Sequence, residues 1–178
     1  MSQRRYMLVD LDDTISGSWR REHLIADSWD AFHADLVNDE PIFDMVRLLT
    51  QLRTASEPRP YWAGKDWNTE FGTVQSALDV NPNSLGVIAL TARPQKWFNA
   101  SQMWLVKHNV PVDELLMRPD DDYRPSPQVK VSVACERFNC TPEQLKDHVA
   151  LIIDDHEGVI KAFAGLGITA LQIYARRD

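Results

Sequence analysis

Four short apolar runs limit what this chain can fold into more than any other feature. They are Tyr6–Val9, Gly86–Leu90, Val149–Ile153 and Thr169–Tyr174. Runs of this kind, apolar without alternation, are typical of parallel strands that are covered on both faces. Helical patterns lie between them, so the sequence predicts an α/β domain with a mainly parallel sheet flanked by helices.

The segments between the strands repeat apolar residues at helical spacing. Proline in a first turn and glycine just after a last turn are common helix boundaries. The helices predicted on this basis are Glu22 to about Leu36, Ile42–Leu52, one that begins at Pro94, one that begins at Pro127, and Glu157–Leu166 followed by Gly167.

One segment interrupts this alternation. Residues Thr54–Ser84 are rich in proline, asparagine and aromatic side chains, with a possible short helix at Thr73–Leu78. We interpret the segment as an insertion on the ligand side of the sheet. A chain of 178 residues fits one domain. We therefore expect a single domain over 1–178, with a core of about 1–20 and 85–178 and a small helical cap or insertion of about 21–84.

Net charge, cysteine content and hydropathy exclude several kinds of partner and site. The formal net charge of −7 argues against extended binding to duplex nucleic acid, which requires basic patches. The two cysteines, Cys135 and Cys140, fit neither a zinc site nor a disulfide framework, so free thiols are expected. No apolar run has membrane-spanning length. These features predict a cytoplasmic protein, or one that acts in the cytoplasm of a host cell.

Three of the four predicted strands end in side chains that can do chemistry. In open α/β sheets, ligands bind at the carboxyl ends of the strands. The residues at these ends are Asp10 with Asp12, Thr91 with Arg93, and Asp154 with Asp155. Their convergence predicts one functional site at this edge of the sheet.

Asp10 and Asp12 suit a division of labour in phosphoryl transfer. In an extended chain, side chains two residues apart project to the same side. One carboxylate can attack phosphorus while the other handles the proton of the leaving group. An isolated Asp-x-Asp is more often a solvated loop end, but the apolar strand directly before Asp10 favours the functional interpretation.

Asp154 and Asp155 suggest a metal site. Carboxylates gathered at one place repel each other unless a cation lies between them. A hard divalent ion with oxygen ligands meets this need, and Mg²⁺ is the usual one where phosphate is also bound. The alternative is that the pair caps a helix, a position that aspartate favours.

The remaining candidates would bind the phosphate. The Thr91 hydroxyl can donate a hydrogen bond to a phosphate oxygen, and the N-terminus of a following helix would add positive potential. Arg93 is placed for a bidentate contact with the phosphate. Lys130 is the best candidate for a cation between the nucleophile and the phosphate. Taken singly, Thr91 could be a helix cap and Lys130 a solvated lysine.

Together, these motifs resemble the four-motif signature of the haloacid dehalogenase (HAD) superfamily. The signature is a strand with Asp-x-Asp-x-Thr, a strand with Thr, a lysine, and a strand with Asp-Asp. The resemblance implies a Rossmann-like fold and a Mg²⁺-dependent phosphatase. By this resemblance, Asp10 is the nucleophile that forms an aspartyl-phosphate, and Asp12 is the general acid/base. Thr91 and Lys130 bind the phosphate, and Asp154 orients Lys130. The metal ligands are Asp10, the backbone carbonyl of Asp12 and Asp155.

A narrower likeness connects the chain to phage HAD proteins similar to the 3′-phosphatase domain of phage polynucleotide kinase. It rests on Asp27–Phe32, Asp39–Ile42, Thr91–Pro94, Leu116–Pro119 with Asp122–Arg124, and Ile153–His156. In that domain an arginine at the place of Arg93 serves the phosphatase site. The chain has no Gly-x-x-x-x-Gly-Lys-Ser/Thr loop, so the kinase half is missing. The implied substrate is a nucleotide or a polynucleotide 3′-phosphate end.

Other functions remain open at this point. A 5′-nucleotidase, or a HAD phosphatase for another small metabolite, would share the same motifs. A receiver domain also uses Asp, Mg²⁺, Thr and Lys, but in a different motif order, and a catalytically silent binding protein would not need the intact acids. Several tryptophans of the expected cap could stack on a base, although packing within a cap or an interface is the commoner role. These are Trp19, Trp29, Trp62 and Trp67.

Overall fold

The structure, a computed structural model, describes residues 4–56 and 85–174 of the chain. Five strands form one sheet in the order β3-β2-β1-β4-β5, and every neighbouring pair is parallel. The strands are β1 (Tyr6–Val9), β2 (Gly86–Pro94), β3 (Glu114–Arg118), β4 (Val149–Asp154) and β5 (Thr169–Gln172). The predicted α/β class with a parallel sheet is confirmed.

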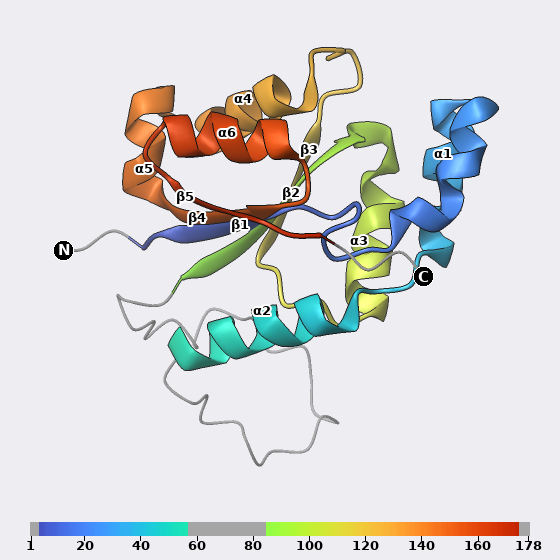
Figure 1. Cartoon of the computed structure of the whole chain (residues 1–178), viewed down its shortest axis with the longest axis horizontal. Helices are drawn as coiled ribbons and strands as arrows, with labels where there is room; N and C mark the ends of the chain where they lie inside the picture. The colour runs from blue at the N-terminus through green and yellow to red at the C-terminus, as the bar shows by residue number, and fades with distance from the viewer. Residues whose placement is uncertain (1–3, 57–84, 175–178) are drawn as a thin grey trace.

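Helices cover both faces of this sheet. In Figure 1, α4, α5 and α6 lie on one face, and α2 and α3 on the other. The α-helices are α1 (Trp29–Ala34), α2 (Phe43–Ser56), α3 (Phe98–Lys107), α4 (Ser126–Phe138), α5 (Leu145–His148) and α6 (Glu157–Gly165). The 3₁₀ segments are η1 (Ser18–Ala26), η2 (Asp35–Asn38), η4 (Gln95–Trp97) and η5 (Pro142–Gln144).

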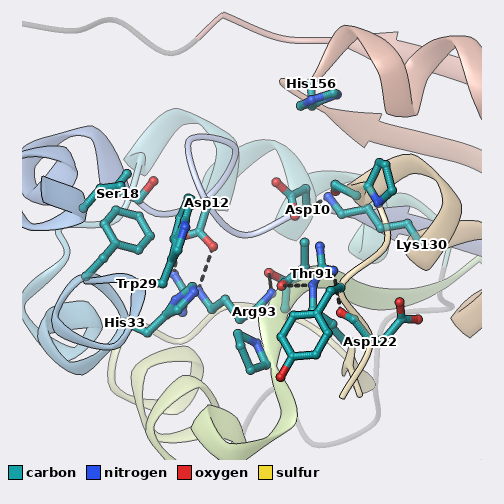
Figure 2. Close-up of a pocket in the computed structure, with 18 of the residues that line it drawn as sticks. Asp10, Asp12, Ser18, Trp29, His33, Thr91, Arg93, Asp122, Lys130 and His156 are labelled. Atoms are coloured by element: carbon teal, nitrogen blue, oxygen red, sulfur yellow. Dashed lines mark hydrogen bonds and ion pairs between the residues drawn. The ribbon is translucent and has the colours of Figure 1, made fainter. Parts of the chain in front are cut away.

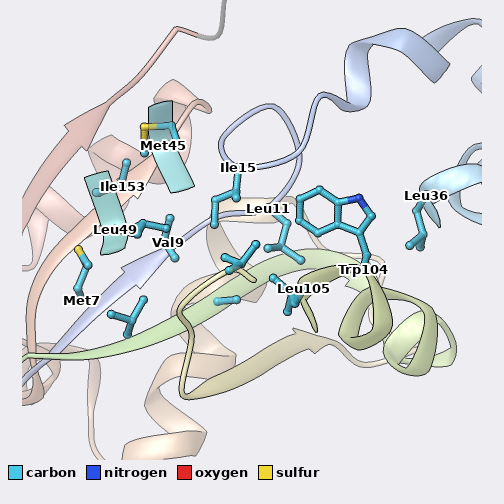
Figure 3. Close-up of a cluster of buried hydrophobic side chains, with 13 residues drawn as sticks. Met7, Val9, Leu11, Ile15, Leu36, Met45, Leu49, Trp104, Leu105 and Ile153 are labelled. Atoms are coloured by element: carbon cyan, nitrogen blue, oxygen red, sulfur yellow. The ribbon is translucent and has the colours of Figure 1, made fainter. Parts of the chain in front are cut away.

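The central strand β1 explains why an apolar run without alternation forms here. Successive side chains of a strand point to opposite faces. Met7 and Val9 therefore join a buried cluster with α2 and α3, which includes Met45 and Trp104 and is drawn in Figure 3. Leu8 joins a second buried cluster with α4, α5 and α6 on the opposite face. Because both faces of β1 are covered, every position of the run is apolar.

The topology brings the functional segments together. β1 pairs with β2 on one side and with β4 on the other. The chain thus leaves β1 toward one edge of the sheet and later crosses to the other half, which makes the carboxyl end of β1 a switch point. The backbone N–H of Asp10 donates to the carbonyl of Ile153 at 3.0 Å and so extends this pairing past β1.

Two strands differ from the sequence prediction. β2 runs to Pro94, so Pro94 ends a strand rather than opening a helix, and α3 begins four residues later at Phe98. β3 was not predicted, because its five residues begin with Glu114 and end with Arg118 and carry no long apolar run. β5 was predicted, but as an edge strand it has only partly buried and exposed side chains.

The helix predicted from Glu22 to about Leu36 is wrong as a single element. The chain forms η1, then α1, then η2. Ser28 lies in extended conformation between η1 and α1, and its hydroxyl accepts a hydrogen bond from the Ala31 N–H at 3.0 Å. This N-cap starts a new helix and so divides the segment.

The expected insertion is described only at its first residues. Thr54 to Ser56 form the end of α2, whereas 57–84, with the possible helix at Thr73–Leu78, lie outside the described residues. α2 itself contributes Met45 and Leu49 to the core. The division into core and cap stays a prediction. Both cysteines are free thiols, as expected. Within 4–56 and 85–174, no helix is long and apolar enough to cross a bilayer.

Candidate active site

A pocket of about 810 Å³ lies at the carboxyl ends of β1, β2 and β4. The residues predicted to act in catalysis, phosphate binding or metal binding line it, except Asp154, which lies directly beneath as the last residue of β4. Figure 2 shows Asp10, Thr91 and Lys130 close together, with Asp12, Trp29 and His33 toward one side and His156 above. The tertiary structure thus brings the predicted residues into one site.

Lys130 joins two buried carboxylates. Its Nζ lies 2.6 Å from Oδ1 of Asp10 and 2.7 Å from Oδ2 of Asp154, and all three side chains are buried. Burial alone disfavours a charged lysine, but the two carboxylates outweigh it and raise the pKa of Lys130. Burial raises the pKa of Asp10 well above its usual value, although Lys130 opposes this. Lys130 is therefore a fixed positive charge beside Asp10.

Asp12 is held by two arginines. Arg93 binds it in a bidentate manner, with Nε 2.8 Å from Oδ2 and Nη2 2.8 Å from Oδ1. Arg21 adds a contact of 2.7 Å from Nη2 to Oδ1. Burial would raise the pKa of Asp12, but the charge and hydrogen bonds of Arg93, with the charge of Arg21, lower it far below the usual value. Asp12 is thus a carboxylate at any physiological pH.

A second carboxylate, Asp39, balances the two arginines. Its oxygens accept from Nε of Arg21 at 2.7 Å and from Nη2 of Arg93 at 3.3 Å. Ser16 donates to Asp39 at 2.8 Å and accepts from Arg93 at 3.0 Å. Two buried arginines without carboxylate partners would be costly, so this network is built as one unit.

The sequence did not indicate Arg21 or Asp39 as site residues. Both lie in the segment expected to form a cap. Asp39 begins one of the segments of the narrower likeness, but no motif predicted a role for it in the site, and none includes Arg21. Their roles depend on Arg93, which is 72 residues from Arg21 and 54 from Asp39 along the chain.

Asp13 adopts a left-handed backbone conformation, with φ of 56°. Aspartate is among the few residues other than glycine that tolerate this conformation. The Asp13 carboxylate accepts from the Ser18 hydroxyl at 2.5 Å and the Trp19 N–H at 2.9 Å. These two contacts hold the turn that contains Asp13.

Asp10, Asp154 and Asp155 each offer a carboxylate oxygen within 4.8 Å of one another. Asp154 already accepts from Lys130 and from the His156 N–H at 2.9 Å, so Asp10 and Asp155 are the better direct ligands. Burial, followed by the charges of Asp154 and Asp13, raises the pKa of Asp155 to about 6. Three carboxylates beside one lysine leave excess negative charge, and their hard oxygen donors fit a Mg²⁺ ion.

Thr91 lies within β2, buried, and its hydroxyl accepts from the Arg93 N–H at 3.2 Å. It is therefore not a helix cap. The helix N-terminus expected directly after Thr91 is absent, because β2 continues to Pro94 and η4 follows. Thr91 faces the pocket beside Asp10, where its hydroxyl can reach a ligand.

His33 is a buried histidine on the pocket wall that the sequence did not single out. It packs against Trp29, Phe32 and Trp97, with ring centroids 6.0, 5.1 and 6.4 Å away. Its Nδ1 has no hydrogen-bond partner among the described residues. Burial lowers the pKa of His33 to about 4, although Asp12 opposes this. Its imidazole is therefore neutral in the folded protein at pH 7.

The burial of a neutral His33 predicts a pH dependence of stability. Between pH 6.5 and about 4, the unfolded chain protonates this imidazole while the folded protein does not. The unfolded state then binds more protons, so the free energy of unfolding falls as the pH falls, by on the order of 2 kcal/mol. Urea unfolding from pH 7 to pH 4.5 should show a shallower loss of stability for His33→Gln than for the wild type.

The matched control is His23→Gln, since His23 is exposed. That variant should follow the wild-type pH profile. Equal slopes for the wild type and His33→Gln would show that His33 does not contribute to the pH dependence.

The family of polynucleotide kinase PNKP phosphatase domains matches residues 65–176, which is more than half of the chain. The matched part contains Thr91, Arg93, Lys130, Asp154 and Asp155. Asp10 and Asp12 lie before it and are connected to it by the geometry of the site. No curated protein matches the sequence.

Solved structures share the fold. A chain of the Pnkp1/Rnl/Hen1 RNA repair complex is similar with a TM-score of 0.67 and 20% identity, over 97% of this chain and 43% of that one. This chain thus spans less than half of that relative's length. A HAD-like hydrolase from Streptococcus pneumoniae is similar with a TM-score of 0.56 and 12% identity, over 97% and 85% of the two chains. A predicted phosphatase from Clostridium acetobutylicum is similar with a TM-score of 0.58 and 12% identity, over 96% and 85%.

The expected family is therefore confirmed, and a receiver domain is excluded. The parallel sheet, the acids at its strand ends and the family match agree: the chain belongs to the HAD-type phosphatases, in the family of polynucleotide kinase PNKP phosphatase domains.

Proposed function

We propose that the protein is a Mg²⁺-dependent phosphomonoesterase that forms an aspartyl-phosphate on Asp10. The observation that carries this proposal is the buried series of Asp10, Lys130 and Asp154, with contacts of 2.6 and 2.7 Å. Lys130 keeps a positive charge beside the attacking carboxylate, and it is available to bind the phosphate oxygens as the substrate enters. Thr91 supplies a hydroxyl at the same end of the pocket.

The proposed reaction has two steps. A carboxylate oxygen of Asp10 attacks phosphorus, and the bond from phosphorus to the leaving oxygen breaks as that oxygen takes a proton. Water then attacks the aspartyl-phosphate and gives up its proton, releasing inorganic phosphate and restoring Asp10. Asp12 serves as the acid in the first step and the base in the second.

The environment of Asp12 prepares it for the second step. Arg93 and Arg21 lower its pKa, so it is ionised, which is the form that can accept a proton from water. For the first step its pKa must rise. The negative charge of an incoming phosphate has this effect, because a like charge disfavours the carboxylate.

Arg93 would interact with Asp12 rather than with the phosphate of the substrate. Its guanidinium donates to Asp12, Ser16, Asp39 and Ser101, and its side chain is fully buried. The direct phosphate contact inferred from the sequence has no support in these contacts. Arg93 would act by positioning Asp12 and keeping it ionised.

Asp10, Asp155 and the backbone carbonyl of Asp12 would hold Mg²⁺, while Asp154 orients Lys130. The ion, when bound, supplies positive charge that neutralises the phosphoryl oxygens. The excess of negative charge among Asp10, Asp154 and Asp155 supports this assignment.

The proposed substrate is a nucleotide or the 3′-phosphate end of a polynucleotide. The family is that of PNKP phosphatase domains, and a similar structure is a chain in an RNA repair complex. More carboxylates than cationic side chains line the pocket, which favours a single phosphate over a long duplex.

A phosphate-release assay tests the proposal. The panel holds 3′- and 5′-mononucleotides, 3′-phosphorylated oligonucleotides and sugar phosphates, each with Mg²⁺ or with EDTA. We expect turnover of the 3′-phosphates with Mg²⁺, loss of turnover in EDTA, and recovery when Mg²⁺ is added back. Preference for 5′-nucleotides or sugar phosphates would replace the substrate assignment with a 5′-nucleotidase or a small-metabolite phosphatase. No turnover of any substrate would contradict the phosphatase activity.

A further inference from the structure

An aromatic column rises from the interior of the protein into the active-site pocket. Trp97 lies against His33, and His33 stacks on Trp29 with an interplanar angle of 27°. Phe32 meets Trp29 edge to face at 5.5 Å. The inner end of the column is fixed by packing, because His33 is only 7% exposed.

The outer end of the column is open. Trp29 is 62% exposed although one of its faces stacks on His33. It was expected to be packed within a cap, and instead it lines the pocket that contains Asp10 and Asp12. Figure 2 shows Trp29 on the same side of the view as Asp12, with Lys130 and Asp122 on the other side. An exposed aromatic face inside a catalytic pocket is available to a ligand.

The position of Trp29 is held in place by neighbouring contacts. The next residue, Asp30, binds Nζ of Lys96 at 2.6 Å and so ties α1 to the segment after β2. The Lys96 N–H donates to Asp120 at 2.7 Å, which connects the same segment to the loop after β3. A ring that is already oriented loses little conformational freedom when a ligand stacks on it.

The loop after β3 carries a second exposed aromatic residue. Tyr123 is 89% exposed and lines the same pocket. The basic residues around it, Arg118 and Arg124, are engaged by protein groups, including the Asp122 carboxylate. This part of the pocket therefore offers aromatic surface with little uncompensated positive charge, which suits a neutral planar group better than another phosphate.

We propose that the exposed face of Trp29 binds an unpaired nucleobase, carried by the same nucleoside as the phosphate that Asp10 attacks. The inference rests on the function proposed above and adds a specificity residue to it. A planar base gains from stacking on an aromatic ring whatever its sequence. The base must be unpaired, because a paired base at a duplex end would bring the partner strand to an acidic pocket.

Two single-stranded oligonucleotides test this inference. Both carry a 3′-phosphate, and they differ only in whether the last nucleotide has a base or is abasic. Stacking on an aromatic side chain typically changes binding by about 10-fold. We expect the wild type to show a KM about 10-fold lower for the substrate with the base, at similar kcat. Trp29→Ala should abolish the difference in KM between the two substrates, whereas Trp29→Phe should keep most of the preference.

The control is Phe43→Ala, an exposed aromatic residue at the start of α2 that does not line the pocket. It should retain the wild-type preference, and the thermal unfolding midpoint of each variant checks its folding. Equal KM values for both substrates in the wild type, or an equal loss on both in Trp29→Ala, would overturn the nucleobase site alone. Absence of hydrolysis of both substrates by the wild type would instead contradict the proposed function.

Discussion

Replacing Asp10 with asparagine is expected to lower kcat for phosphate release by about 10³-fold or more, the scale of losing a catalytic nucleophile. The amide has no negative charge with which to attack phosphorus. The fold should persist, because burial already raises the pKa of Asp10 and so favours a neutral group there. The measurement is single-turnover phosphate release in Mg²⁺, together with thermal unfolding of the variant.

Asp44→Asn provides the matched control for this result. Asp44 is an exposed aspartate in the first turn of α2, outside the pocket. Its substitution should leave kcat unchanged. Full activity in a folded Asp10→Asn protein would remove Asp10 as the nucleophile, and labelled phosphate trapped on the wild type but not on the variant would support it.

Replacing Lys130 with methionine is expected to destabilise the metal-free protein by about 3–5 kcal/mol, as does breaking other buried ion pairs. The lysine is the cation between Asp10 and Asp154, and its loss leaves two carboxylates buried without it. Urea unfolding in EDTA measures the change. Turnover should also fall, because the phosphate loses a positive charge.

A double variant separates the two effects. Lys130→Met with Asp154→Asn removes one carboxylate together with the lysine and should recover part of the lost stability, but not the activity. The matched single control is Lys161→Met, on the exposed face of α6. Wild-type stability of Lys130→Met in EDTA would show that the short contacts of Lys130 do not stabilise the fold.

The arrangement around Asp12 shows how two acids two residues apart can differ. Asp10 lies beside one lysine and another carboxylate, and its pKa is raised. Asp12 lies between two arginines, and its pKa is lowered. In active sites, neighbouring acids often have different pKa values because their environments differ, and they then serve in different roles. The difference shows that the neighbours of each acid in space, rather than its place in the motif, decide its charge.

Much of the fold followed from local patterns. Three of the strands that carry the site were predicted because their residues are apolar on both faces, a requirement of a covered parallel sheet. β3 was not predicted because this five-residue strand begins and ends with charged residues, Glu114 and Arg118, and so contains no long apolar run. The long helix predicted from Glu22 was wrong because the Ser28 cap competes with helical periodicity, and a capping hydrogen bond begins a new helix.

The class of site follows from local sequence patterns, because the acids, the threonine and the lysine occur in a recognisable order beside apolar strands. They are Asp10, Asp12, Thr91, Lys130 and the Asp154–Asp155 pair. The charge state and the hydrogen-bond partners of these residues depend on tertiary contacts. Arg93 reaches Asp12 across 81 residues of chain, and the network is completed by Arg21 and Asp39, for which no motif predicted a role in the site. The sequence named Trp29 as one of several tryptophans that could stack on a base, and the fold shows that its exposed ring lines the pocket. Apolar periodicity depends on residues that are close along the chain, whereas desolvation and ion pairing depend on residues that are close in space. For this reason the charge state of the site could not be predicted from local patterns.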